Sequence, residues 1–251
     1  MAQLFKPAAN QAAKMSLIFG TTLPIVIGLM IAAVSRSPLN TKVEVPKNQP
    51  VPFSHQHHAW ELGIDCRYCH TSVEKSSFAG IPPTETCMSC HSQIWTNSPM
   101  LEPIRQSYET GTPIRWNKVN KVPEFVYFNH SIHIARGLNC NTCHGPVQEM
   151  NITYKGNAFQ MAWCVQCHRA PQNYFYKDES RPDLSPRQQV FNLYWKLQEK
   201  GRSGLSGREQ DFIEGHDPIS LAKDDVDKGR KLVNEYGVKV QQLADCSVCH
   251  R

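Results

Sequence analysis

The feature that most constrains this chain is the motif Cys-x-x-Cys-His, which occurs five times. All ten cysteines belong to it, and none is left over. The cysteines are Cys66 and Cys69, Cys87 and Cys90, Cys140 and Cys143, Cys164 and Cys167, and Cys246 and Cys249. The histidines that follow them are His70, His91, His144, His168 and His250. We number the motifs sites 1 to 5 in chain order.

Cys-x-x-Cys-His is the attachment sequence of a c-type haem. Two thiols three residues apart reach the two vinyl groups of one porphyrin, and the adjacent histidine becomes the proximal ligand of the iron. A disulfide scaffold would not require a histidine after each pair, and zinc sites need two Cys-x-x-Cys half-sites per metal, which an odd number does not supply. A thioredoxin-like redox pair occurs once, in a βαβ setting. The sequence therefore predicts five covalently bound haem c groups.

The composition agrees with an interior filled by cofactors. Hydrophobic residues make up 40% of the 251 residues, and the mean hydropathy is -0.46, so side chains alone would form a thin core for this length. The net charge of +5 is mildly basic, without a clustered basic patch interleaved with aromatic residues. A nucleic-acid partner is therefore not expected.

Residues 15–35 form an uncharged apolar stretch of 21 residues. At about 1.5 Å per residue a helix of this length spans roughly 30 Å, the thickness of a bilayer core. Lys6 and Lys14 precede it, which predicts a cytoplasmic segment over residues 1–14 and a haem region outside the membrane. The alternative is a cleaved signal peptide with a cut site near Ser35, although the stretch is longer than a typical signal-peptide core.

The haem region contains an internal repeat. Phe-x-His-x-x-His begins at Phe53 and again at Phe128, and each copy is followed by two cysteine motifs. The distance from the phenylalanine to the first cysteine is 13 residues in one copy and 12 in the other. We therefore expect a Pro-rich extended linker over residues 36–52, dihaem units over 53–127 and 128–180, and a fifth haem carried by 181–251.

The repeat also identifies candidate distal ligands of the haem irons. The four histidines that match between the copies are His55, His58, His130 and His133. His57 aligns with Ile132, so we do not expect it to be a ligand. Ser54 and Asn129 are good helix N-caps, which would place each pair on one face of a short helix. In related multihaem patterns the first histidine serves the next haem, which assigns His55 to site 1 and His130 to site 3 and leaves the other two histidines open.

Four paired histidines leave one of five irons without a distal ligand. His216, Met100 and Met161 are the candidates, and an open iron is the remaining alternative. A methionine ligand would raise that haem's potential relative to a second histidine.

The last third of the chain predicts two longer helices. Ser185-Pro186 is an N-cap followed by a proline at the first helical position, before apolar residues at a helical spacing. A second helix is predicted from Asp224 to a stop at Gly237. The expected fold class is mainly α with much irregular structure, with class III-like haem packing and one N-terminal transmembrane helix.

Several segments resemble the membrane-anchored pentahaem cytochrome c subunit of bacterial alternative complex III. They are FSHQHHAWELGIDCRYCH, IPPTETCMSCHSQIW, FVYFNHSIHIARGLNCNTCHGPV, QMAWCVQCHR and DCSVCHR. The resemblance implies a non-catalytic electron-transfer subunit on the periplasmic side of the bacterial inner membrane. It also implies partners: an iron–sulfur subunit, polytopic membrane subunits, a monohaem cytochrome and in some cases a terminal oxidase.

Two other functions fit the motifs less well. A membrane-anchored quinol dehydrogenase of nitrate or nitrite respiration also has several haems and one N-terminal helix, but its first motif follows the anchor more closely than Cys66 does here. A multihaem reductase of nitrogen or sulfur oxyanions would need an open iron, and none of the five motifs is an unusual variant.

Overall fold

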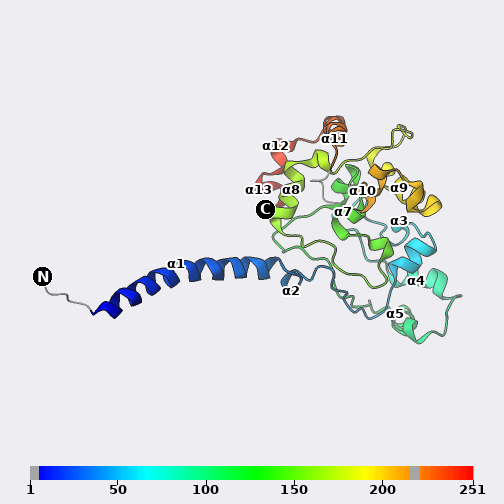
Figure 1. The fold of residues 1–251 in the computed structure, drawn as a ribbon. Helices are drawn as coiled ribbons and strands as arrows, with labels where there is room; N and C mark the ends of the chain where they lie inside the picture. Colours follow the sequence, from blue (N-terminus) through cyan, green and yellow to red (C-terminus); the bar gives the residue numbers. More distant parts are fainter. Residues whose placement is uncertain (1–5, 215–220, 251) are drawn as a thin grey trace. The chain divides into compact units, whose positions relative to one another are not determined.

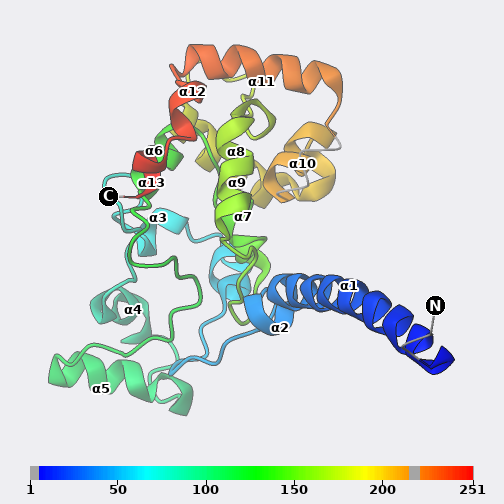
Figure 2. The same ribbon diagram turned by 90° about the vertical axis from the view of Figure 1, so that its left-hand side faces the viewer.

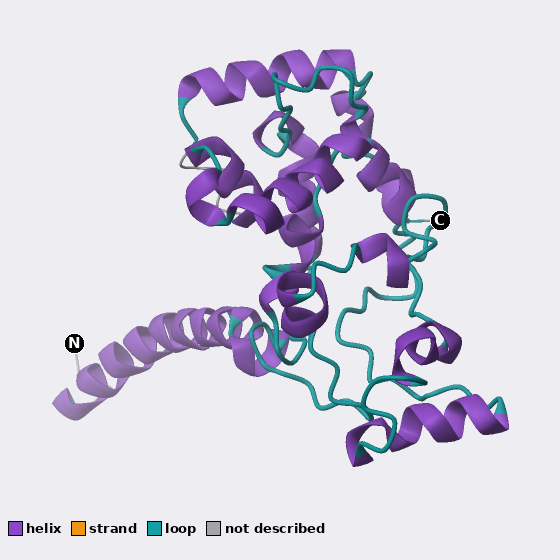
Figure 3. Ribbon diagram, turned by 90° about the vertical axis from the view of Figure 1, so that its right-hand side faces the viewer, coloured by secondary structure: helices purple, strands orange, loops and turns teal. Residues whose placement is uncertain are grey.

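The computed structural model describes residues 6–214 and 221–250. It divides into two compact units, Met1–Val43 and Glu44–Arg251 (Figure 1). In the described residues the regular secondary structure consists of helices, and long loops connect them (Figure 3). The expected mainly helical fold is therefore confirmed.

The first unit contains α1 (Pro7–Arg36) and a single turn, α2 (Pro38–Thr41). Ala8–Arg36 is long and apolar enough to cross a membrane, with a mean hydropathy of 2.3, and a signal sequence would meet the same criteria. The helix contains the predicted span and begins before it. The linker expected over residues 36–52 is not extended throughout, because α2 lies within it.

In the second unit, each cysteine motif lies on a helix. These helices are α3 (Cys66–Cys69), α4 (Thr84–His91), α7 (Cys140–His144), α8 (Met161–Arg169) and α13 (Cys246–Cys249). The remaining α-helices are α5 (Glu102–Thr110), α6 (His130–Ala135), α9 (Pro186–Lys200), α10 (Gly207–Glu214), α11 (Lys223–Glu235) and α12 (Val240–Leu243). Short 3-10 turns are η2 (Pro99–Leu101), η3 (Val147–Glu149), η4 (Pro171–Asn173) and η5 (Arg202–Gly204).

The two histidine pairs lie on short helical segments, as the sequence predicts. His58 lies in the π-helical turn η1 (Gln56–Glu61), and His55 is the N-cap of that turn. The hydroxyl of Ser54 accepts a hydrogen bond from the backbone N–H of His57. The other pair lies on α6, where the Asn129 side chain accepts from the N–H of Ile132. The Asn129 N-cap is therefore confirmed. The first segment has the wider π geometry with His55 as its N-cap, and the Ser54 hydroxyl bonds it from one residue earlier.

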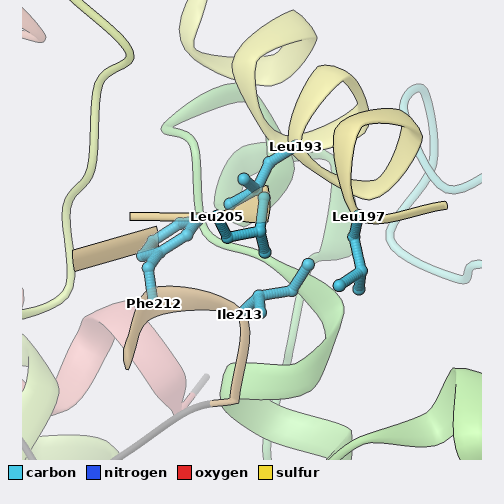
Figure 4. Packing of buried hydrophobic residues seen from close by; sticks show 5 residues of the cluster. All are labelled: Leu193, Leu197, Leu205, Phe212 and Ile213. Carbon is cyan, nitrogen blue, oxygen red and sulfur yellow. The ribbon is translucent and has the colours of Figure 1, made fainter. Parts of the chain in front are cut away.

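The predicted helix after Ser185 is α9, and Gln188 completes its capping box by accepting from the Ser185 N–H at 2.9 Å. This helix provides part of the largest apolar cluster in the described residues. Figure 4 shows Leu193 and Leu197 of α9 facing Phe212 and Ile213 of α10, with Leu205 between the helices. The second predicted helix is α11, which begins one residue early, and Gly237 follows it with φ of +62°.

Apolar packing is concentrated in the later part of the second unit. The remaining buried clusters are small: one joins Phe175 to Leu232, Val233 and Tyr236, and another joins Val73, Ile134 and Phe191. In both Figure 1 and Figure 2, α4 and α5 lie at the opposite end of this unit from α11. The region around the first two cysteine motifs thus has little side-chain core of its own, as expected if haem groups fill it.

Candidate functional site

The cysteine motifs share one local geometry. Each pair lies on a helical turn that keeps its two sulfurs on the same side, and all ten cysteines are free of disulfides. At site 1 the side chain of Asp65 caps the turn by accepting from the Arg67 N–H, and at site 3 Asn139 does the same for Thr142. At these two sites the residue before the first cysteine therefore starts the turn that carries both thiols.

The five proximal histidines all engage Nδ1 in a hydrogen bond. Four bond a backbone carbonyl oxygen: His70 that of Gly80 at 2.6 Å, His91 that of Ile94 at 3.1 Å, His168 that of Leu243 at 2.8 Å, and His250 that of Phe125 at 3.1 Å. His144 instead faces the amide of Asn120 at 3.0 Å. A proton held on Nδ1 leaves the lone pair of Nε2 available to a metal.

The four candidate distal histidines show the same arrangement. Nδ1 of His58 bonds the Ser54 carbonyl at 2.8 Å, and Nδ1 of His133 bonds the Asn129 carbonyl at 2.7 Å. The repeat is thus reproduced at atomic detail, because in each copy the residue that follows the phenylalanine holds the second histidine through its carbonyl oxygen. Nδ1 of His130 bonds the Ser77 carbonyl at 2.8 Å, and Nδ1 of His55 faces the Thr153 hydroxyl at 3.0 Å.

Three pairs of imidazoles stand at a spacing that fits a haem iron between them. A metal-bound imidazole nitrogen lies about 2 Å from the metal and about 1.2 Å from its ring centre, so two imidazoles on opposite sides of one iron have centres about 6.4 Å apart. The observed ring-centre distances are 6.3 Å for His130 and His144, 6.2 Å for His133 and His168, and 6.2 Å for His58 and His91. These side chains fit bis-histidine haem.

The pairing bears on a question that the sequence leaves open, namely which sites His58 and His133 face. His130 lies beside the proximal histidine of site 3, as expected, while His133 lies beside that of site 4 and His58 beside that of site 2. Burial, followed by the charge of His70 of site 1, lowers the pKa of His55 to about 4. The assignment of individual ligands stays a prediction, and this arrangement supports it.

His57 is arranged differently. Its Nδ1 lies 2.8 Å from a carboxylate oxygen of Glu61, and both side chains are about half exposed. Its ring also stacks on Trp95 at 6.3 Å between centres. This surface contact agrees with the expectation that His57 is not a ligand.

Site 5 has no second histidine beside it in the described residues. The ring of His250 lies 5.7 Å from that of Phe125, at an angle of 31°. Of the three candidates for the remaining ligand, His216 lies outside the described residues, and Met100 and Met161 both have exposed side chains. Met161 begins α8, the helix of site 4, whereas Met100 lies in η2, which packs against α5.

Haem is the cofactor that these side chains fit, rather than a directly bound ion. In residues 6–214 and 221–250, no three histidine, cysteine or acidic side chains come together in a way that could hold a metal ion alone. The imidazoles stand in pairs, which suits an iron whose other four positions are filled by a porphyrin.

Comparison with known proteins gives the same result. The family described as "Cytochrome c7 and related cytochrome c" matches residues 126–190, and the "Class III cytochrome C family" matches residues 31–103. A relative in Nitratidesulfovibrio vulgaris, "Menaquinone reductase, multiheme cytochrome c subunit", is 30% identical over 171 residues, which are 59% of this chain and 81% of the relative. This chain belongs to the multihaem cytochromes c. It binds haem c and transfers electrons.

The sites of the cytochrome lie close to one another. The Tyr68 hydroxyl of site 1 lies 2.8 Å from the Ser89 hydroxyl of site 2. A hydrogen bond to the Cys140 thiol of site 3, together with burial, raises the pKa of the Cys66 thiol of site 1. Sites 1, 2 and 3 are therefore neighbours.

The later sites of the cytochrome continue this series. Burial, followed by the charge of Cys167 of site 4, raises the pKa of the Cys143 thiol of site 3 to about 12. Burial, followed by the charge of Cys249 of site 5, raises the pKa of the Cys164 thiol of site 4. The hydrogen bond from His168 to the Leu243 carbonyl also joins site 4 to the segment that leads into site 5.

Sequence reasoning missed the role of the phenylalanine in each histidine segment of this cytochrome. Phe53 stacks on His58 at 4.5 Å and meets His55 edge-on at 4.9 Å. Phe128 repeats both contacts with its own pair, at 4.5 and 4.7 Å. The signal was present, because the phenylalanine occupies the same position in both copies of the repeat.

Proposed function

We propose that this cytochrome carries five haem c groups and conducts electrons along them, as a subunit of a membrane quinone oxidoreductase. The observation that carries the proposal is the repeated imidazole pairing at 6.2 to 6.3 Å on sites that lie next to one another. Bound haem supplies one-electron redox chemistry at each site. The chain's own residues hold the groups in place and fix the orientation of the ligands.

The contacts between sites support a single line of transfer in the order 2, 1, 3, 4, 5. The Tyr68–Ser89 contact joins sites 2 and 1, and the hydrogen bond between the thiols of Cys66 and Cys140 places sites 1 and 3 next to each other. Sites 3 and 4 share α6, since His130 and His133 lie three residues apart on it. Electrons would then enter and leave at sites 2 and 5.

The membrane complex is inferred from two resemblances. The relative's name describes a cytochrome subunit of a menaquinone reductase, and the sequence segments resemble the pentahaem subunit of alternative complex III. In both cases the cytochrome would work between a quinone-reactive partner and a second electron carrier. We propose that α1 anchors the chain in the bacterial inner membrane, with the haem region on the periplasmic side, and that iron–sulfur, polytopic and monohaem cytochrome subunits are its partners.

For the remaining ligand at site 5 we propose Met161. Its helix, α8, packs against α12, which leads into site 5, whereas Met100 lies with α5, at the end of the unit that carries site 2. A thioether ligand would give this terminal haem a higher potential than its bis-histidine neighbours.

The experiment counts the bound haems and then removes the site in the middle of the proposed order. Intact-mass and haemochrome analysis of the full chain should give five haems. Replacing Cys140 and Cys143 by alanine should remove site 3, so that a protein reductant acting at one end reduces only two haems rapidly. Rapid reduction of all four remaining haems would contradict the linear order, and fewer than five haems in the wild type would contradict the cofactor count.

A quinol dehydrogenase of the nitrate and nitrite type is the second candidate, because the relative's name also refers to a quinone reaction. That function predicts direct reduction of the purified chain by a quinol analogue. A conducting subunit should stay oxidised until its partner subunits are added.

A further inference from the structure

One proximal histidine differs from the other four in what holds it. His70, His91, His168 and His250 each face a main-chain carbonyl oxygen through Nδ1. His144 faces a side chain, the amide of Asn120, at 3.0 Å. Any residue can supply a main-chain carbonyl. Only at site 3, therefore, does the hydrogen-bond partner of the proximal histidine depend on the identity of one side chain.

The position of the protons defines which end of that amide faces His144. An imidazole that ligates through Nε2 carries its proton on Nδ1 and needs an acceptor there. With Nδ2 of Asn120 toward Nδ1, two donors would meet. The other end of the amide, Oδ1, is buried and makes no hydrogen bond within the described chain. The two ends have nearly the same shape, and turning the amide over lets Oδ1 accept the Nδ1–H of His144.

The backbone that carries Asn120 is held on both sides. The side chain of Lys47 donates to the Lys118 carbonyl at 2.8 Å, and Gln49 bonds the main chain of Asn117. Further along the same loop, the N–H of Tyr127 donates to the carbonyl of Cys249 at 2.8 Å. Asn120 therefore approaches His144 from an anchored segment.

We propose that Asn120 is a positioning residue of site 3, accepting the Nδ1–H of His144 through Oδ1 and so tuning the reduction potential of the haem bound there. A stronger acceptor increases electron donation by the imidazole and favours ferric iron, whereas loss of the acceptor favours ferrous iron. This rests on the proposed haem at site 3. In the proposed order that site is the middle of five, so every electron that crosses the chain passes it.

The test is redox titration of the full-length protein with two opposite substitutions. Asn120→Asp keeps the shape and strengthens the acceptor, so it should favour the ferric state of one haem at least tenfold, a fall of about 59 mV for a one-electron couple. Asn120→Leu removes the acceptor and should raise the same component. Changes to such supporting residues typically alter metal-site properties about 10- to 100-fold. His130→Ala, which turns the site 3 haem high-spin, identifies the component that belongs to site 3.

Asn117→Asp is the matched control, because it adds the same charge to the same loop where the amide bonds the Asn48 carbonyl rather than a histidine. It should change the ferric-to-ferrous equilibrium of the site 3 haem less than twofold. Opposite shifts in the two Asn120 variants support the proposal. Shifts in the same direction, no shift, or an equal shift in Asn117→Asp would overturn it. Fewer than five haems in the wild type would overturn the proposed function as well, whereas five haems with an unmoved potential would overturn only this role of Asn120.

Discussion

Replacing His58 by alanine tests the distal ligand assignment most directly. Its ring centre lies 6.2 Å from that of His91, within about 0.2 Å of the separation expected for two imidazoles on one iron. Removing the ring leaves the thioether bonds and the proximal ligand of site 2 in place. One haem in five should therefore become high-spin, so that about 20% of the low-spin absorbance is lost while the mass of the haem-loaded chain falls only by the side-chain difference.

His57→Ala is the control within the same segment. It removes an imidazole one residue away, and with it the exposed contact to Glu61, a type of pair that contributes about 0.3–0.5 kcal/mol, and the ring contact with Trp95. Its spectrum should match the wild type, and added imidazole should restore the low-spin bands of His58→Ala alone. The second copy of the repeat offers the same comparison, with His133→Ala against Ile132→Ala. An unchanged low-spin spectrum in His58→Ala, or an equal loss in His57→Ala, would refute the assignment.

Three further predictions concern stability and the fifth haem. Gly229→Ala would place a Cβ against the backbone carbonyl oxygen of Gln172 in η4, so it should destabilise the protein by about 1–3 kcal/mol in denaturant titrations. Gly207→Ala, with open space around it, should not. The pKa of Glu209 is lowered overall, because burial raises it but its hydrogen bonds, first the one from Lys196, lower it by more. Glu209→Gln should therefore cost about 3 kcal/mol of stability at neutral pH, and this difference should shrink as the pH falls below 4.5. A constant difference would contradict the ion pair with Lys196. Met161→Leu should remove the sulfur-to-iron charge-transfer band and lower one potential, and Met100→Leu should do neither; the reverse result would exchange their roles.

The sequence predicted the parts of the fold that depend on neighbouring residues. The cysteine turns, the Asn129 N-cap, the hydrogen bond of the Ser54 hydroxyl and the helix after Ser185 all follow from short-range spacing. The same Ser-Pro signal occurs at Ser37 and Pro38, where it begins α2. The short helix within the expected linker could therefore have been predicted from the sequence.

The parts that could not be predicted depend on distant contacts. A spacing of three residues places two imidazoles on one face of a helix, but it does not say which site lies opposite each ring. His58 and His91 are 33 residues apart, and Asn120 and His144 are 24 apart, so only the folded chain brings them together. Most Nδ1 partners are backbone carbonyls, which carry no residue signature.

The aromatic contacts of Phe53 have a consequence for how such a cytochrome can change over time. One ring touches both His55 and His58, and in the proposed assignment these belong to different haems. A substitution there would disturb two redox centres together, so neither can evolve in isolation at that position. The same two contacts recur around Phe128, so the second copy of the repeat couples its two redox centres in the same way.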